Sequence, residues 1–209
     1  MRADSIAFAI SGMLFGVIVG WILGNQQSAG VTATTAPTTA AAPAATGEGG
    51  RAPAAPLDEN RAKELVAAAS GAPSDPAPRV ELGNLYFDAE RYPEAVEWYG
   101  QALRLKPDDA NVSTDLGVAY YYTDQPDKAI QQFEQSLKSD PLHTKTMLNM
   151  GIVKAFGKQD LAGAAASWQQ VIAIAPDSPE ATAAKKALEG LQQAHPGGPA
   201  AGASGASGS

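Results

Sequence analysis

The chain offers few side chains that perform covalent or metal chemistry. Its 209 residues include no cysteine and two histidines, His143 shortly after Pro141 and His195 close to the carboxyl end. Neither histidine has a set of metal ligands or a nucleophile near it in the sequence. The motifs of phosphate-binding loops, dinucleotide turns and nucleophile elbows do not occur either. We therefore predict that the protein is not an enzyme and that it holds no metal and no cofactor.

The charge of the chain is acidic, with a formal net charge of −7. Residues 57–194 carry all of this excess, because they contain 13 Lys and Arg against 20 Asp and Glu. Nucleic acid and anionic lipid both require a positive footprint. The balance therefore argues against nucleic acid as a partner, and we interpret the acidic residues as a solvated surface that keeps the domain soluble.

One spaced pattern of small, aromatic and proline residues recurs with a period of 34 residues. The first two copies read Leu82-Gly83, Tyr86, Ala95, Tyr99 and Pro107, then Leu116-Gly117, Tyr120, Ala129, Phe133 and Pro141. The third reads Met150-Gly151, Lys154, Ala164, Trp168 and Pro176, with one extra residue between its glycine and its alanine. Such a period is typical of stacked units that bury a core only against their neighbours.

Each copy suits two antiparallel helices. Gly83 and Ala95 are small where the two helices would cross most closely, and Tyr86 and Tyr99 are large where the crossing opens. The pattern resembles the tetratricopeptide repeat, a helix-turn-helix unit, over residues 76–176. The resemblance implies an all-α superhelix, or α-solenoid, of about three repeats that binds a protein or peptide.

Each end of the array is predicted to carry a cap. One period before Tyr99 and Ala102 stand Leu65 and Ala68, so residues 57–75 are predicted as a half-repeat in front of repeats at 76–178. Ser178-Pro179 suits a helix start, which predicts a capping helix over 179–195. Residues 196–209 are rich in Pro, Gly, Ala and Ser and are predicted to be a disordered tail.

The N-terminal segment has the composition of a membrane span. Ile6–Leu23 is free of charged residues and reaches the length that crosses a hydrocarbon core, so residues 1–24 are predicted as a single-pass anchor. A cleaved signal peptide is the alternative. Arg2 precedes the span and the next basic residue is Arg51, which favours a bacterial inner-membrane protein with periplasmic repeats. Residues 25–56, rich in Ala, Thr and Pro, are predicted as a disordered linker.

Four glycines fall every fourth residue within the predicted span. A helix would place them along one face that another helix can approach closely, which predicts homo-oligomers through this face. The alternative is that glycine is simply frequent in membrane helices. The four residues are Gly12, Gly16, Gly20 and Gly24.

The resemblance also implies a peptide-binding groove lined by the first helix of each repeat. Its residues, matched position by position, are Val80, Asn84, Phe87, Asp88, Thr114, Val118, Tyr121, Tyr122, Lys145, Leu148, Asn149, Ile152 and Phe156. Asn84, Lys145 and Asn149 would supply part of a carboxylate clamp, but Val80 and Val118 depart from one. We therefore expect an apolar peptide held by aromatic rings. The alternative is that some rings, Tyr122 above all, pack between adjacent units.

These features predict a membrane-tethered adaptor that binds a peptide segment of a partner protein. An alternative is an assembly factor, because anchor, linker and repeats ending in Pro176-Asp177-Ser178-Pro179 are similar to the tetratricopeptide proteins of bacterial cytochrome c maturation, which present apocytochrome or haem-lyase subunits. A second alternative is a scaffold that associates with itself.

Overall fold

A computed structural model of the chain describes residues 56–196. The predicted span with its four glycines, the linker up to residue 55 and the tail from residue 197 lie outside the described residues. None of the helices in the described segment is long and apolar enough to cross a membrane.

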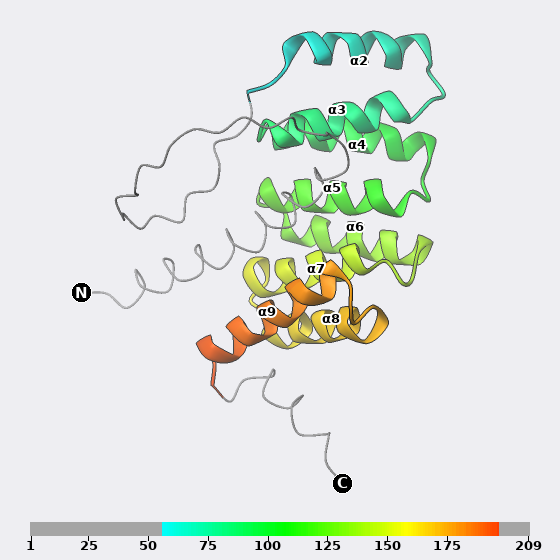
Figure 1. Cartoon of the computed structure of the whole chain (residues 1–209). Coiled ribbons are helices and arrows are strands. Elements are labelled where there is room, and N and C mark those ends of the chain that lie inside the picture. The colour runs from blue at the N-terminus through cyan, green and yellow to red at the C-terminus, as the bar shows by residue number, and fades with distance from the viewer. Residues whose placement is uncertain (1–55, 197–209) are drawn as a thin grey trace, which may run out of the picture. The chain divides into compact units, whose positions relative to one another are not determined.

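Residues 56–196 form eight α-helices and no strand (Figure 1). The helices are α2 (Glu59–Gly71), α3 (Ala77–Asp88), α4 (Tyr92–Leu105), α5 (Ala110–Tyr122), α6 (Pro126–Ser139), α7 (Thr144–Ile152), α8 (Leu161–Ile174) and α9 (Pro179–Ala194), and a π-helical turn, η2 (Val153–Gly157), follows α7. The predicted all-helical solenoid is therefore confirmed for this segment.

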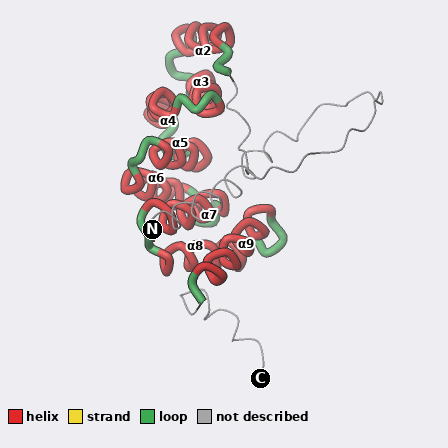
Figure 2. Tube along the Cα trace, turned by 90° about the vertical axis from the view of Figure 1, so that its left-hand side faces the viewer, coloured by secondary structure: helices red, strands yellow, loops and turns green. Residues whose placement is uncertain are grey.

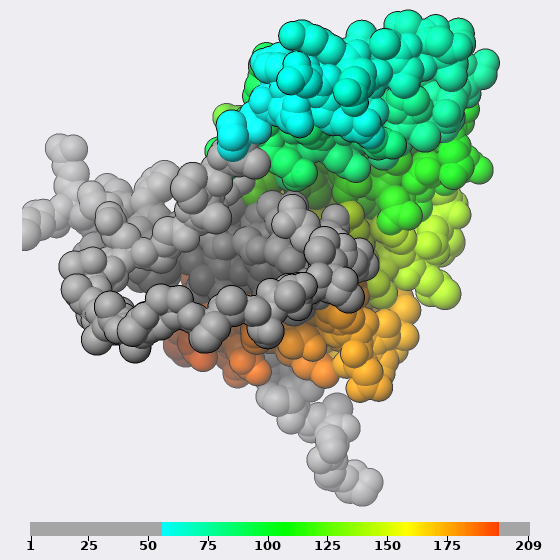
Figure 3. Space-filling model, turned by 45° about the horizontal axis from the view of Figure 1, so that its top comes forward, coloured from blue at the N-terminus to red at the C-terminus, as the bar shows by residue number. Residues whose placement is uncertain are grey.

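The helices pack in chain order, each against the next. Figure 2 shows α3 and α5 in one layer and α4 and α6 in a second layer beside it. Contacts between α5 and α7, and between α7 and α9, continue the first layer. In the space-filling view of Figure 3 the helices follow one another along the stack from cyan α2 to orange α8. Each helix thus buries its apolar stripe against its neighbours, as stacked repeats require.

The period of the chain also sets where the first helices begin. Asp75 Oδ1 accepts a hydrogen bond from Ala77 N at 2.9 Å, and Asp109 Oδ1 accepts one from Val112 N at 3.2 Å. At the corresponding position before α9, Ser178 Oγ accepts from Ala181 N at 3.0 Å. These oxygens satisfy backbone N–H groups that have no partner within the helix.

An aromatic ring of each second helix lies against the glycine of the first helix. A Cβ atom added to Gly83 would lie 2.4 Å from the Tyr99 ring, and Gly117 has the same relation to Phe133. In the third unit, a Cβ on Gly151 would lie 2.2 Å from Trp168 Nε1. Tyr99 was predicted to lie where the crossing opens, but its ring lies against Gly83, so that prediction is wrong. The glycine is required because the ring occupies the space of its missing side chain.

The extra residue of the third unit is absorbed by η2. In the first two units the turn after the first helix is closed by bonds from Arg91 N to Tyr86 O (2.8 Å) and from Gln125 N to Tyr120 O (2.9 Å). The third unit closes the same turn with Asp160 N and Lys154 O at 2.8 Å, one residue further apart. A π-turn inserts one residue into a helix without ending it.

The turns themselves keep one geometry in all three units. Glu90, Asp124 and Gln159 each have a positive φ, of 57°, 58° and 56°. These values lie in the left-handed region that ends many helices. The second helix of the third unit therefore starts in the same phase as its counterparts, despite the added residue.

The two ends of the stack differ slightly from expectation. On α2 the buried stripe is Ala62, Leu65 and Ala69, and the predicted Ala68 is exposed. This helix lies at the end of the stack, where Ala62 and Leu65 pack with Leu82 of α3 and Trp98 of α4, so one stripe at helical spacing suffices to cover it. On α9 the residues that are buried against α7 and α8 are Ala181, Ala183, Ala184, Ala187 and Leu191.

We predict that Gly117→Ala destabilises the domain by about 1–3 kcal/mol, because its Cβ would overlap the Phe133 ring, which is fully buried and has no room to move. Gly100→Ala is the matched control, since nothing lies within 4 Å of a Cβ there. In this control the gain in helix propensity should raise stability by up to about 1 kcal/mol. Urea unfolding of both variants measures the difference, and equal stabilities would contradict the close glycine–ring contact.

Candidate functional site

The predicted groove residues all lie on the first helices and η2, a surface that we call the first-helix face. Five of them are buried, namely Phe87, Thr114, Leu148, Asn149 and Ile152. The side chains that reach solvent are Asn84 and Asp88, which are exposed, and the half-buried Val80, Val118, Tyr121, Tyr122, Lys145 and Phe156. Burial leaves the first five little surface for a partner, so the accessible face is smaller than the sequence suggested.

The aromatic rings form a seam between units. Tyr92 and Tyr122 stack with centroids 4.4 Å apart and planes at 11°. Phe87 meets both rings edge-on, at 5.2 Å and 5.7 Å. Tyr121 extends the seam from Tyr122 at 6.0 Å. For Phe87 and Tyr122 the structure therefore favours the alternative interpretation, in which the rings join α3, α4 and α5.

The π-turn η2 closes the far end of this seam. A Cβ on Gly157 would lie 2.9 Å from Pro126 Cβ and 3.0 Å from Tyr121 Cε2. Only glycine lets the η2 backbone approach the start of α6 and the Tyr121 ring so closely. The turn thereby fixes the position of Phe156, its neighbour in the sequence.

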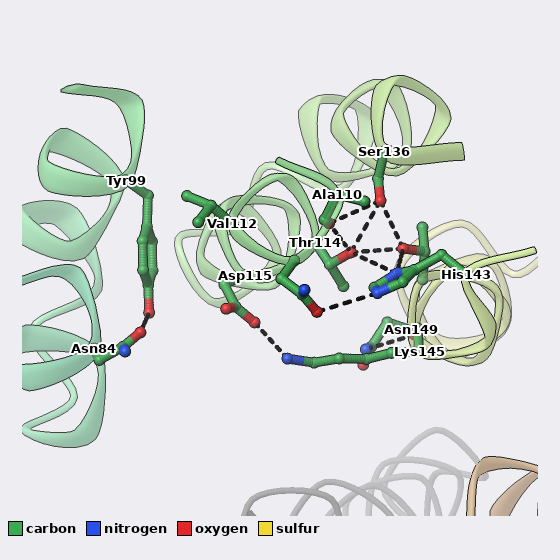
Figure 4. Close-up of polar contacts among 12 residues, drawn as sticks. Asn84, Tyr99, Ala110, Val112, Thr114, Asp115, Ser136, His143, Lys145 and Asn149 are labelled. Carbon is green, nitrogen blue, oxygen red and sulfur yellow. Dashed lines mark hydrogen bonds and ion pairs between the residues drawn. The ribbon is translucent and has the colours of Figure 1, made fainter. Parts of the chain in front are cut away.

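Asn84 serves the packing of its own unit as well as the face. Its Oδ1 accepts a hydrogen bond from Tyr99 Oη at 2.7 Å (Figure 4). Burial, with the Asp115 and Asp88 carboxylates nearby, raises the pKa of Tyr99, so the phenol keeps the proton that it donates. In the second unit the ring is Phe133, which has no hydroxyl, and the residue in place of Asn84 is Val118, which packs against that core. The first unit thus has a hydrogen-bonded polar pair, Asn84 and Tyr99, where the second unit has an apolar pair, Val118 and Phe133.

Acidic groups dominate the accessible part of the face. Lys145 Nζ pairs with Asp115 Oδ1 at 2.8 Å, and both side chains are about three-quarters covered (Figure 4). Burial, and next the charge of Asp115, raise the pKa of Asp88. Within residues 56–196 Asp88 has no ion-pair partner. The Lys145 ammonium thus pairs with Asp115 alone and Asp88 adds a second carboxylate, so this face is more polar than the apolar lining that we expected.

The three side chains of a partial carboxylate clamp are engaged elsewhere. Asn84 accepts from Tyr99, and Lys145 pairs with Asp115. Asn149 is 7% exposed and its Nδ2 donates to Lys145 O at 2.9 Å. Each of the three side chains therefore already has a partner within the domain.

A cluster of hydroxyl groups and one imidazole lies beneath the face, where α5, α6 and α7 meet. Thr146 Oγ1 lies 2.5 Å from Thr114 Oγ1 and 2.8 Å from Ser136 Oγ. His143 Nδ1 lies 2.6 Å from Thr146 Oγ1, and its Nε2 lies 3.1 Å from Asn111 Oδ1. The three hydroxyl side chains are fully buried. In Figure 4 the labelled side chains of Thr114, Ser136 and His143 point toward one another.

This cluster was not predicted from the sequence, although the repeat pattern contained a signal for it. The positions that correspond to Thr114, Ser136 and Thr146 in the neighbouring repeats are all apolar. One repeat earlier they are Val80, Ala102 and Val112, and one repeat later they are Leu148, Val171 and Ala181. The middle junction alone has Thr114, Ser136 and Thr146 there. His143 likewise stands where Asp109 and Ser178 cap the other helices, and its side chain forms no cap. Comparing the copies position by position, rather than by motif, would have found them.

Comparisons with known proteins agree with this architecture. A family model described as TPR repeat matches residues 83–124, and one described as Tetratricopeptide repeat matches residues 114–179. Residues 83–179 are tetratricopeptide repeats. No curated protein matches the sequence.

Three solved structures, two of them of TPR domains, have the same fold at low sequence identity. The crystal structure of MamA is 18% identical with a TM-score of 0.57, over 65% of this chain and 75% of that chain. The first TPR domain of human RPAP3 is 24% identical with a TM-score of 0.53, over 58% and 93%. The first TPR of Spaghetti (RPAP3) bound to the HSP90 peptide SRMEEVD is 22% identical with a TM-score of 0.50, over 66% and 95%.

We predict that Thr146→Val alone destabilises the repeats by about 1–3 kcal/mol, because it removes the buried hydroxyl that lies 2.6 Å from His143 Nδ1 and 2.5 Å from Thr114 Oγ1. The triple change Thr114→Val, Ser136→Ala and Thr146→Val should be close to neutral or stabilising, since it replaces the network by the apolar residues found at neighbouring junctions. Urea unfolding measures both. A triple variant as unstable as the sum of its single changes would show that the cluster holds the junction together.

Proposed function

We propose that this protein is an adaptor whose tetratricopeptide domain binds a peptide segment of a partner protein on the first-helix face. The observation that carries the proposal is a set of accessible polar side chains, Asn84, Asp88 and Lys145, on helices that a rigid aromatic seam holds in place. A preorganised surface loses little conformational entropy when a peptide binds. A structure of the same fold holds the HSP90 peptide SRMEEVD, which supports peptide binding as a use of this architecture.

The charges of the face indicate the chemistry of the peptide. Asp88 is an exposed carboxylate, and the nearby ammonium of Lys145 already pairs with Asp115. An acidic peptide or a free C-terminal carboxylate would be repelled there. A segment that places Lys or Arg beside Asp88 and apolar side chains against Val118 suits the face better.

We also propose that the domain is tethered to a membrane by residues 1–24. The support is the uncharged segment Ile6–Leu23 and the absence of basic residues between it and Arg51. A tether of this kind would place the repeats outside the cytoplasmic membrane of a bacterium, within reach of membrane or periplasmic partners.

We predict that Asp88→Arg reduces partner recovery from detergent-solubilised membranes at least about tenfold, which corresponds to roughly 1.4 kcal/mol of binding free energy. The reason is that the change reverses the charge of the accessible carboxylate on the face. Glu97→Arg is the matched control, because it makes the same charge change at an exposed position of α4. Affinity capture with the full-length chain, followed by mass spectrometry, measures recovery.

The same experiment separates the alternatives. Equal recovery by both variants would move binding away from the first-helix face. Recovery of apocytochromes or haem-lyase subunits would favour the assembly factor, and recovery of further copies of this chain alone would favour the self-associating scaffold.

We predict that the full-length chain stays with membranes during an alkaline wash, whereas the chain without residues 1–24 is released. A hydrophobic span resists such a wash because removing it from lipid exposes its apolar side chains to water. N-terminal sequencing of the protein from membranes serves as the control. A mature N-terminus after residue 24 would establish the cleaved signal instead of the anchor.

A further inference from the structure

The junction between α5, α6 and α7 differs in chemistry from the other junctions of the stack. It buries Thr114, Ser136 and Thr146 at positions where the neighbouring junctions have only apolar side chains. His143 closes the cluster from the loop before α7. An imidazole, whose ordinary pKa is 6.5, thus lies at the boundary between two repeats.

When the imidazole is neutral, each hydrogen bond of the cluster has a definite donor and acceptor. With Asn111 Oδ1 as acceptor, His143 Nε2–H donates to it, so Nδ1 carries no proton. Thr146 Oγ1–H then donates to Nδ1, and Thr114 or Ser136 donates to Thr146 Oγ1. Ala110 O accepts the remaining hydroxyl proton, since both Thr114 Oγ1 and Ser136 Oγ lie within 2.9 Å of it.

A second proton on the imidazole reverses this order. Nδ1 becomes a donor, so Thr146 must accept from it and turn its own hydroxyl toward Thr114 or Ser136. The change also places a positive charge in a half-buried site. Three carboxylates face the ring, Asp140 in the preceding loop, Asp115 on α5 and Glu180 on α9, and one ammonium, that of Lys145 on α7.

We propose that His143 makes the junction between the second and third repeats an acid-sensitive hinge, in which protonation loosens α7 from α5 and α6. The hinge acts on the first-helix face as well, because Lys145 on α7 and Asp115 on α5 form their ion pair across this junction at 2.8 Å. Stacked repeats interact only with their neighbours, so one junction opens without unfolding the others.

The sign of the effect follows from the burial of the ring. Burial, the largest cause, lowers the pKa of His143 below its ordinary value of 6.5, with Lys145 acting in the same sense and the carboxylates opposing. A lowered pKa in the folded state means that the neutral ring stabilises the junction at pH above 6.5. This stabilisation is lost as the pH falls from there through the folded pKa. Each unit by which folding lowers the pKa corresponds to a tenfold change in the opening equilibrium.

The test combines two measurements on the full-length chain in detergent. NMR titration of the imidazole signals measures the pKa of His143 against its ordinary value of 6.5. Hydrogen exchange at about pH 7.5 and about pH 5.5, corrected for the intrinsic rates, gives the protection of α7 and α3 separately. We expect His143 to titrate below 6.5, and the protection of α7 to fall several-fold more than that of α3 in acid.

Two variants keep the result interpretable. His143→Asn removes the titrating ring and supplies a residue that caps helices, so α7 is expected to lose its pH-dependent fall even if its protection is lower at both pH values. His195→Asn should leave the wild-type response intact. An identical acid response in His143→Asn, or a His143 pKa at or above 6.5, would overturn the proposal.

Discussion

Close contact between a glycine and a buried ring is the constraint on which the rest of this domain depends. Gly83, Gly117 and Gly151 each leave the volume that a ring of the partner helix fills. This contact sets the distance between the two helices of a unit, and every further helix packs against a pair placed in this way. Because the contact repeats with the period of the chain, so do the helix starts and the turns between them.

Much of the fold could be predicted from the sequence, because period, proline positions and capping residues are local signals. The first-helix face was less predictable. A motif identifies which positions point toward the first-helix side, but burial depends on the size of neighbouring residues: Phe87 is covered by Tyr92 and Tyr122, and Thr114 by the helices around it. The polar network around Thr114 depends on three helices meeting, which one repeat considered alone does not reveal.

Packing and solvent exposure are divided between neighbouring side chains of the same helices. Phe87 faces its neighbours and joins units, whereas Asp88 beside it is exposed and carries charge. The seam holds the backbone while the polar positions remain available for contact. Change at an exposed position therefore alters the surface chemistry without altering the core, which is how one repeat architecture presents different surfaces.

The π-turn after α7 has a consequence for how such arrays vary in length. A residue added to an ordinary helix rotates everything beyond it by about 100°, since 3.6 residues make a turn. In η2 the extra residue widens one turn instead, and the left-handed residue Gln159 restores the geometry found after α3 and α5. An insertion at the end of a first helix thus changes the structure only locally, and the helices beyond it keep the positions that the repeat period gives them.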